Sequence, residues 1–204
     1  MQADSTAVVL VGFQNDYFGD DGIVRTILDD PFPMDTVLAN TLALLRALAD
    51  TGVTLIATPI VLCPTASEIG MPDGIMKDLR ALGAFAEGTV GADAVPEVAA
   101  LGERIIIVPG KVGFNAFTAT GLEDVLRERG IRDVVIAGVL TSLCIDSTGR
   151  AAYERGYRVT VLVDCAAGRT PVEHDFYCAN IFPLYGRTAL SGALVDELTL
   201  STVT

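Results

Sequence analysis

The segment DVVIAGVLTSLCIDSTGRAAYERGYRVTVLVD, from Asp133 to Asp164, decides the fold class. It begins with a continuous apolar run, Asp133 to Val139, of the kind that forms a strand buried on both faces of a parallel sheet. A segment with helical spacing follows and ends at Gly156, and a second apolar run, Tyr157 to Asp164, comes next. Strand, helix and strand in this order predict a right-handed crossover between parallel strands.

The same alternation extends through the rest of the chain. Three more apolar runs predict strands: AVVLVGF (Ala7 to Phe13), VTLIAT (Val53 to Thr58) and RIIIVPG (Arg104 to Gly110). We therefore expect an α/β protein with a three-layer α/β/α arrangement, a Rossmann-like, mostly parallel sheet flanked by helices. No linker or repeat divides the sequence, so we expect a single domain over residues 1–204.

Helix signals fall between these runs. MDTVLANTLALLRALADTG predicts a helix with Asp35 or Thr36 as its cap and Gly52 as its terminator, and GLEDVLRERG predicts one that ends at Gly130. The stretch from Pro59 to Glu103 is irregular apart from a predicted helix over Ile75 to Leu82, and open α/β sheets place ligand-contacting loops in such insertions.

The composition argues against several kinds of partner. A net charge of −12, with 14 scattered Lys and Arg residues, predicts no nucleic acid and no membrane as partner. Although 50% of the residues are hydrophobic, no apolar run approaches the roughly 20 residues of a membrane span. Four cysteines without CxxC spacing fit neither a disulfide framework nor a zinc site, and we expect reduced thiols in a cytoplasmic protein.

Cys144 is the candidate nucleophile because it follows the strand Asp133 to Val139 within the first turn of the next helix. Helix N-termini carry partial positive charge and free N–H groups, which stabilise a thiolate and can bind an oxyanion. Taken alone, a free cysteine is more often a buried core residue. Other segments of the chain are therefore needed to distinguish a catalytic cysteine from a core cysteine.

Four segments occur in the order found in one family of cysteine hydrolases. They are AVVLVGFQNDYF (Ala7 to Phe18), FAEGTVGADAVPEV (Phe85 to Val98), GKVGFNAFTATGLEDVLRERGI (Gly110 to Ile131) and GVLTSLC (Gly138 to Cys144). With them the chain resembles the isochorismatase-like hydrolases, which include nicotinamidases and N-carbamoyl amidohydrolases. The match runs from about Ala7 to Gly192, and it implies a small-molecule substrate and a homodimer or homotetramer.

The resemblance implies that Cys144 is the nucleophile and that Lys111 is the cation beside it. A protonated lysine near sulfur favours the thiolate and can guide protons during acyl transfer. In the family the peptide bond before the residue that matches Leu140 is typically cis, and the backbone N–H groups of Leu140 and Cys144 would form the oxyanion hole. Without the resemblance, Lys111 would be read as a solvent-exposed lysine at a strand end.

The resemblance also implies substrate contacts. Phe18, Phe114 and Phe117 are expected as pocket walls, with a core position open for each, and Glu68 of the irregular stretch is expected near the substrate. Asn15 and Tyr17 have a weaker claim to line the pocket.

The chain departs from the family at Gly12. The first-strand motif of the family reads D-x-QND, and here the residue two before Gln14 is glycine. The aspartate normally takes the thiol proton and returns it to the leaving amine, a role worth about 10² to 10⁴ in rate. Glycine can do neither.

Four accounts of Gly12 remain open, beside an engineered Asp-to-Gly substitution. A carboxylate from Asp16, Asp20 or Glu68 can swing in, although Asp16 belongs to the QND pattern and fits a structural role better. The substrate can supply the carboxylate or a good leaving group. The glycine can make room for a bulky substrate at a reduced rate, or the chain can bind a ligand without catalysis.

We expect no metal and no other cofactor. Many amide-cleaving relatives bind a metal through D-x-H after the second strand, but ATPIVLCPTASEIG (Ala57 to Gly70) contains neither residue. The single histidine, His174, is expected at a solvated surface, since one histidine alone builds no metal site. The other cysteines are expected as packed core side chains; they are Cys63, Cys165 and Cys178.

The leading hypothesis is a metal-independent cysteine hydrolase that opens a carbon–nitrogen bond in an amide, carbamoyl or lactam substrate through a thioester at Cys144. Vinyl-ether hydrolysis, as in isochorismatases proper, is weaker, because that reaction relies on the acid that Gly12 lacks. The third hypothesis is a ligand-binding protein that has lost catalysis. The retained Cys144 and Lys111 argue against it.

Overall fold

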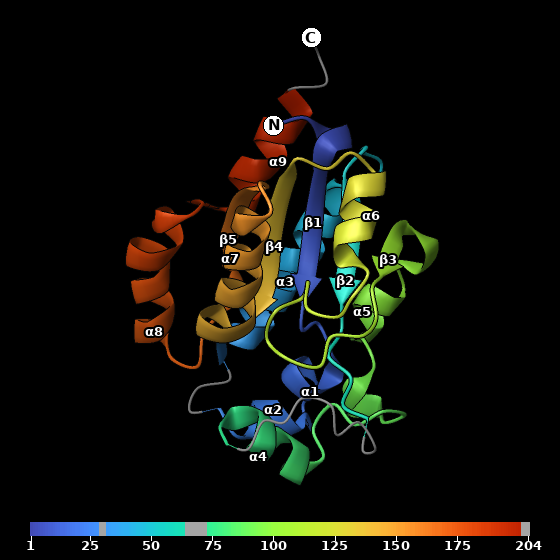
Figure 1. Cartoon of the computed structure of the whole chain (residues 1–204), viewed down its shortest axis with the longest axis vertical. Helices are drawn as coiled ribbons and strands as arrows, with labels where there is room; N and C mark the ends of the chain where they lie inside the picture. The colour runs from blue at the N-terminus through green and yellow to red at the C-terminus, as the bar shows by residue number, and fades with distance from the viewer. Residues whose placement is uncertain (29–31, 64–72, 201–204) are drawn as a thin grey trace.

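A parallel sheet forms the centre of the molecule (Figure 1). The computed structural model describes residues 1–28, 32–63 and 73–200, and in this part of the chain six strands lie in the order β3-β2-β1-β4-β5-β6. The strands are β1 (Thr6–Val11), β2 (Thr54–Thr58), β3 (Ile105–Ile107), β4 (Asp133–Val139), β5 (Arg158–Ala167) and β6 (Arg187–Ala189). Every neighbouring pair is parallel, which confirms the predicted fold class.

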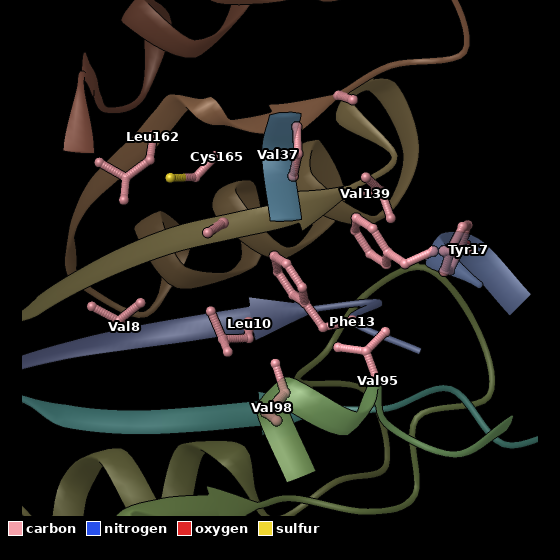
Figure 2. Close-up of a cluster of buried hydrophobic side chains, with 14 of the residues drawn as sticks. Val8, Leu10, Phe13, Tyr17, Val37, Val95, Val98, Val139, Leu162 and Cys165 are labelled. Atoms are coloured by element: carbon pink, nitrogen blue, oxygen red, sulfur yellow. The ribbon is translucent and has the colours of Figure 1, made fainter. Parts of the chain in front are cut away.

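The side chains of β1 alternate between two buried clusters because successive residues of a strand point to opposite faces. Val8 and Leu10 join one cluster, and Val9 and Val11 join the other. Figure 2 shows Val8 and Leu10 in the first of these clusters. Both faces of β1 are therefore covered, as its continuous apolar sequence predicts.

Helices form the two outer layers. On one face, α3 (Phe32–Ala47) and α9 (Ser191–Leu200) contribute leucines to the first cluster; on the other, α6 (Leu122–Glu128) and α7 (Asp146–Glu154) contribute to the second. The three-layer prediction is thus confirmed. The shorter helices are α1 (Asn15–Phe18), α2 (Ile23–Thr26), α4 (Ile75–Leu82), α5 (Pro96–Ala99) and α8 (Pro171–Phe176), with 3-10 turns at Ala3–Ser5, Val90–Ala92, Gly102–Arg104 and Phe182–Leu184 and π-helical turns at Thr141–Ile145 and Tyr177–Ile181.

Two sequence predictions about helix α3 need correction. Helix α3 begins at Phe32 rather than at Asp35 or Thr36, because Pro33 is well tolerated in a first helical turn. Asp35 instead binds Arg25, with Oδ1 2.9 Å from Nη1. The helix ends at Ala47, well before Gly52, where a side chain would collide with Asp4.

The sequence analysis also missed β6 and placed the end of β5 too early. Strand β6 is a three-residue edge strand that carries Arg187, so it has neither the length nor the apolar run of a buried strand. Of the helices in the described ranges, none has both the length and the apolar character needed to cross a membrane.

The strand order reverses between β1 and β4, whose carboxyl ends lie side by side with Val11 opposite Gly138. Open α/β sheets bind ligands in the crevice outside such a switch point. Gly12 directly follows β1, and Leu140 directly follows β4. The candidate residues named from the sequence therefore begin at the edge of the sheet where a ligand is expected.

Candidate active site

Lys111 and Cys144 meet beyond the carboxyl ends of the strands. Lys111 follows β3 and is held by a parallel bridge to Ile60, and its Nζ lies 3.6 Å from Sγ of Cys144. Both side chains are buried, with exposed fractions of 1% and 3%. Among the described residues Lys111 forms no ion pair with a carboxylate, so the cysteine sulfur is the group placed to balance its charge.

Cys144 lies on η4 (Thr141–Ile145), a π-helical turn that leads into α7, rather than in an ordinary first turn. The backbone N–H groups of Leu143 and Ile145 donate to the carbonyl of Leu140 at 3.1 and 3.2 Å. Turns of this type occur frequently at functional sites. The bond Val139–Leu140 is cis, as the family resemblance implies. The oxyanion hole at the N–H groups of Leu140 and Cys144 stays a prediction.

Gly12 is buried, and its backbone has a φ of +77°, a left-handed conformation that favours glycine. A Cβ built there would lie 2.9 Å from the carbonyl oxygen of Val139 and 3.0 Å from Cε2 of Tyr17. Figure 2 shows Tyr17 on α1, beyond the tip of β1 and near Val139 at the end of β4. The aromatic ring of Tyr17 therefore occupies the space that a side chain at residue 12 would enter.

Tyr17 and Cys144 are neighbouring buried side chains. Burial raises the pKa of the Tyr17 hydroxyl well above its usual value, and the neighbouring Cys144 and Asp16 raise it further. At neutral pH the group is a phenol and can donate a proton. The sequence named Tyr17 only among the weaker pocket residues, because its motif gives no sign of a contact with the cysteine.

Of the three carboxylates suggested as a replacement for the aspartate, Asp16 is fully occupied elsewhere. Its Oδ1 accepts from the N–H of Ile23 at 3.1 Å and its Oδ2 from the N–H of Phe85 at 2.5 Å. The structural role anticipated for Asp16 is confirmed. Asp20 is exposed, and Glu68 lies outside the described residues.

Helix α8 makes two polar contacts with η4, the turn that carries Cys144. Ser142 donates to Glu173 Oε1 at 2.7 Å, and the hydroxyl of Thr141 lies 2.8 Å from Nδ1 of His174. The prediction that His174 is solvated was wrong: the ring is partly buried, and burial lowers its pKa. Nε2 of His174 also lies 3.5 Å from the sulfur of Cys178. These contacts link the turn that carries Cys144 to α8.

The three aromatic candidates for pocket walls lie in different environments. Phe18 stacks on Phe13 with ring centroids 5.0 Å apart, and Phe117 packs against Tyr157 at 6.3 Å. Both have the contacts of core side chains, the alternative that the sequence left open. Phe114 is half-buried and packs against both clusters, so it remains the best of the three candidates for a pocket wall.

The remaining cysteines differ in burial. Cys165 is fully buried in the first cluster, and burial raises the pKa of its thiol to about 11. Cys63 and Cys178 are only partly buried, so the core prediction is too strong for them; burial still raises the pKa of Cys178 to about 11. A thiol with a raised pKa is a poor nucleophile at neutral pH.

A cavity of about 300 Å³ reaches Leu140 at the switch point. Arg169, Thr170 and Glu173 line one side of it, and apolar residues line the rest; these are Val24, Ile27, Leu28 and Ile75. The lining thus combines apolar side chains with the ion pair Arg169–Glu173, as small-molecule sites commonly combine apolar and polar groups. Within the part of the chain that the structure describes, no three His, Cys, Asp or Glu side chains gather in a group that could hold a metal ion.

Comparison with protein families and known proteins agrees with this geometry. The model of the Isochorismatase domain family matches residues 6–192. YddQ of Bacillus subtilis, an uncharacterized isochorismatase family protein, is 28% identical over 181 residues, covering 85% of this chain and 88% of that protein. YwoC of the same organism, also an uncharacterized isochorismatase family protein, is 28% identical over 107 residues, and this alignment spans only 56% of YwoC and 52% of this chain.

Two further proteins are similar. The ureidoacrylate amidohydrolase RutB of Methylobacterium radiotolerans is 36% identical over 81 residues, covering 39% of this chain and 31% of RutB. The crystal structure of a cysteine hydrolase from Pseudomonas syringae pv. phaseolicola superposes with a TM-score of 0.81 at 20% identity, covering 96% of this chain and 93% of that one. At this identity the superposition supports the fold alone.

Proposed function

Since the chain belongs to the isochorismatase family of hydrolases, we propose that it hydrolyses a carbon–nitrogen bond of a small molecule, in an amide, carbamoyl or lactam group, without a metal. The observation that carries the proposal is the buried contact of 3.6 Å between Lys111 Nζ and Cys144 Sγ. The local similarity to RutB, named as an amidohydrolase, supports a substrate with an amide or ureido group.

The proposed reaction has two stages. The thiolate of Cys144, paired with the ammonium group of Lys111, attacks the carbonyl carbon and forms a tetrahedral oxyanion, which the N–H groups of Leu140 and Cys144 would stabilise. Collapse of this intermediate breaks the C–N bond; the leaving nitrogen takes up a proton, which the attacking water later returns, and departs as the amine, and a thioester remains on Cys144. Water then attacks the thioester, and the acid leaves with the thiolate restored.

Gly12 favours one other candidate function, a ligand-binding protein without catalysis, because the family's usual proton-transfer group is absent. Vinyl-ether hydrolysis requires that same acid and has no observation in its favour here. The two remaining candidates differ in whether Cys144 becomes acylated.

A substrate panel tests the proposal. Chelator-treated protein is incubated with ureido acids, primary amides and lactams, amine release is measured, and the intact protein is examined by mass spectrometry after acid quenching. We expect turnover of at least one class, an acyl adduct on Cys144, and no activity in Cys144→Ala. Tight binding with no adduct and no turnover would support the binding protein instead.

A further inference from the structure

The position of the Tyr17 ring explains how this chain folds without an aspartate at residue 12. A Cβ on Gly12 would lie 3.0 Å from Cε2 and 3.3 Å from Cδ2 of Tyr17, which is tighter than ordinary van der Waals contact. A carboxylate beyond that Cβ would have to enter the volume of the ring. The observed position of the Tyr17 ring therefore requires a glycine at residue 12.

The ring is held firmly in this place. Tyr17 has an exposed fraction of 4%, and it packs against Phe85 with ring centroids 4.8 Å apart and an interplanar angle of 41°. The neighbouring Asp16 accepts a hydrogen bond from the N–H of Phe85. Asp16 and Tyr17, two adjacent residues of α1, thus both contact Phe85, which holds the Tyr17 ring in place.

The hydroxyl end of the ring, at Cε2, is the part of Tyr17 nearest to residue 12. Cys144 is a neighbour of this hydroxyl, so the phenol of Tyr17 and the amine of Lys111 both lie beside the sulfur. A tyrosine that only filled space would have no need of an oxygen at this point. A hydroxyl in this place can exchange a proton with a group bound at the sulfur.

We propose that Tyr17 replaces the missing aspartate and is the proton-transfer residue of the active site. This inference rests on the proposed function. When the tetrahedral intermediate collapses, the C–N bond breaks and the Tyr17 hydroxyl gives its proton to the leaving nitrogen, which becomes the free amine. Water then forms a bond to the thioester carbon and passes a proton to the phenolate of Tyr17. The C–S bond breaks, and the thiolate and the phenol are both restored.

The first test needs no substrate. Tyr17→Phe keeps the ring and its contact with Phe85 but removes the hydroxyl, and Tyr157→Phe is the matched control, because Tyr157 is also buried but lies at the opposite end of β5. Iodoacetamide labelling of Cys144 is followed against pH by peptide mass spectrometry. We expect the midpoint in Tyr17→Phe to move to higher pH by about one unit, since the thiolate loses a neighbouring hydroxyl donor. A midpoint equal to that of the wild type and of Tyr157→Phe would overturn the proposal.

The second test separates proton transfer from packing. On an amide, we expect Tyr17→Phe to lower kcat/KM by about 10² to 10⁴. On an activated ester, whose leaving group departs without a proton, we expect a loss below about tenfold. Equal losses on both substrates would contradict the proposal. If the wild type turns over neither substrate, the proposed function fails, while the labelling result still reports on the contact between Tyr17 and Cys144.

Discussion

At the scale of single residues, the site depends on the contact between Lys111 and Cys144. The ammonium group of Lys111 is buried against the sulfur of Cys144, and burying a charge without a counter-charge is costly. In the proposed reaction this pair acts as thiolate and ammonium. Cys165 and Cys178, whose pKa is raised by burial to about 11, lack such a cation and should remain thiols at neutral pH.

Asp16 is the residue whose loss should destabilise the site most. Asp16→Ala leaves the buried N–H groups of Ile23 and Phe85 without their carboxylate partner. We expect the free energy of unfolding to fall by about 2 to 4 kcal/mol, measured by urea denaturation followed by circular dichroism. The control is the exposed Asp20→Ala, with an expected change below about 0.5 kcal/mol. Equal effects of the two substitutions would contradict the structural role of Asp16.

At the scale of elements, two junctions shape the site: the passage from β1 into α1, and the contact of α8 with the turn η4. The first places Gly12 and Tyr17 in competition for one space, and the second anchors the residues beside Cys144. Neither junction could be predicted from the sequence. Patterns of apolar residues predict which segments form helices and strands, whereas these contacts depend on a left-handed glycine and on helices distant in the chain.

The competition between residues 12 and 17 can be measured with a double-mutant cycle. Gly12→Asp should lower the free energy of unfolding by about 1 to 3 kcal/mol, because its side chain meets the Tyr17 ring and the Val139 carbonyl. In a Tyr17→Ala background, the fall in the free energy of unfolding caused by Gly12→Asp should be smaller by about 0.5 to 3 kcal/mol. Gly12→Ala in both backgrounds gives the same cycle without the carboxylate. Additive effects would mean that the two positions do not share space.

The contact between α8 and η4 should make stability depend on pH through His174. Burial lowers the pKa of the folded-state ring, while the acidic neighbours Asp175 and Glu173 oppose this. The unfolded chain then binds a proton more readily, so stability is fully present above the unfolded pKa of about 6.5 and is lost as pH falls below it. We expect the Tm to drop between pH 7.5 and pH 5.5 by more in the wild type than in His174→Asn. The same drop in both proteins would show that His174 is not linked to folding.

At the scale of the whole molecule, the strand order predicts the location of the site before any side chain is considered. The order reverses between β1 and β4, and Gly12 and Leu140 follow these two strands. The sequence predicted the buried strands well, because strands covered on both faces are continuous apolar runs. It missed the exposed edge strand β6, which has no such run.

Assembly is the other prediction at this scale. Large apolar side chains are exposed around α7 and α8, among them Val172 at 79%, Phe176 at 53% and Leu184 at 72%. We expect sedimentation equilibrium to give two or four times the chain mass of 21.4 kDa, and Val172→Asp with Leu184→Asp to shift the protein toward monomers. A monomer at micromolar concentration would contradict the predicted homodimer or homotetramer.

The central claim is that Lys111 makes Cys144 a nucleophile. The most direct test is the rate of alkylation of Cys144 by iodoacetamide at pH 7, read by peptide mass spectrometry in the wild type and in Lys111→Met, with Cys178 of the same protein as an internal reference. The account predicts that Cys144 reacts at least about tenfold faster than Cys178 and that Lys111→Met removes most of this difference. Equal rates for Cys144 in the two proteins would contradict it.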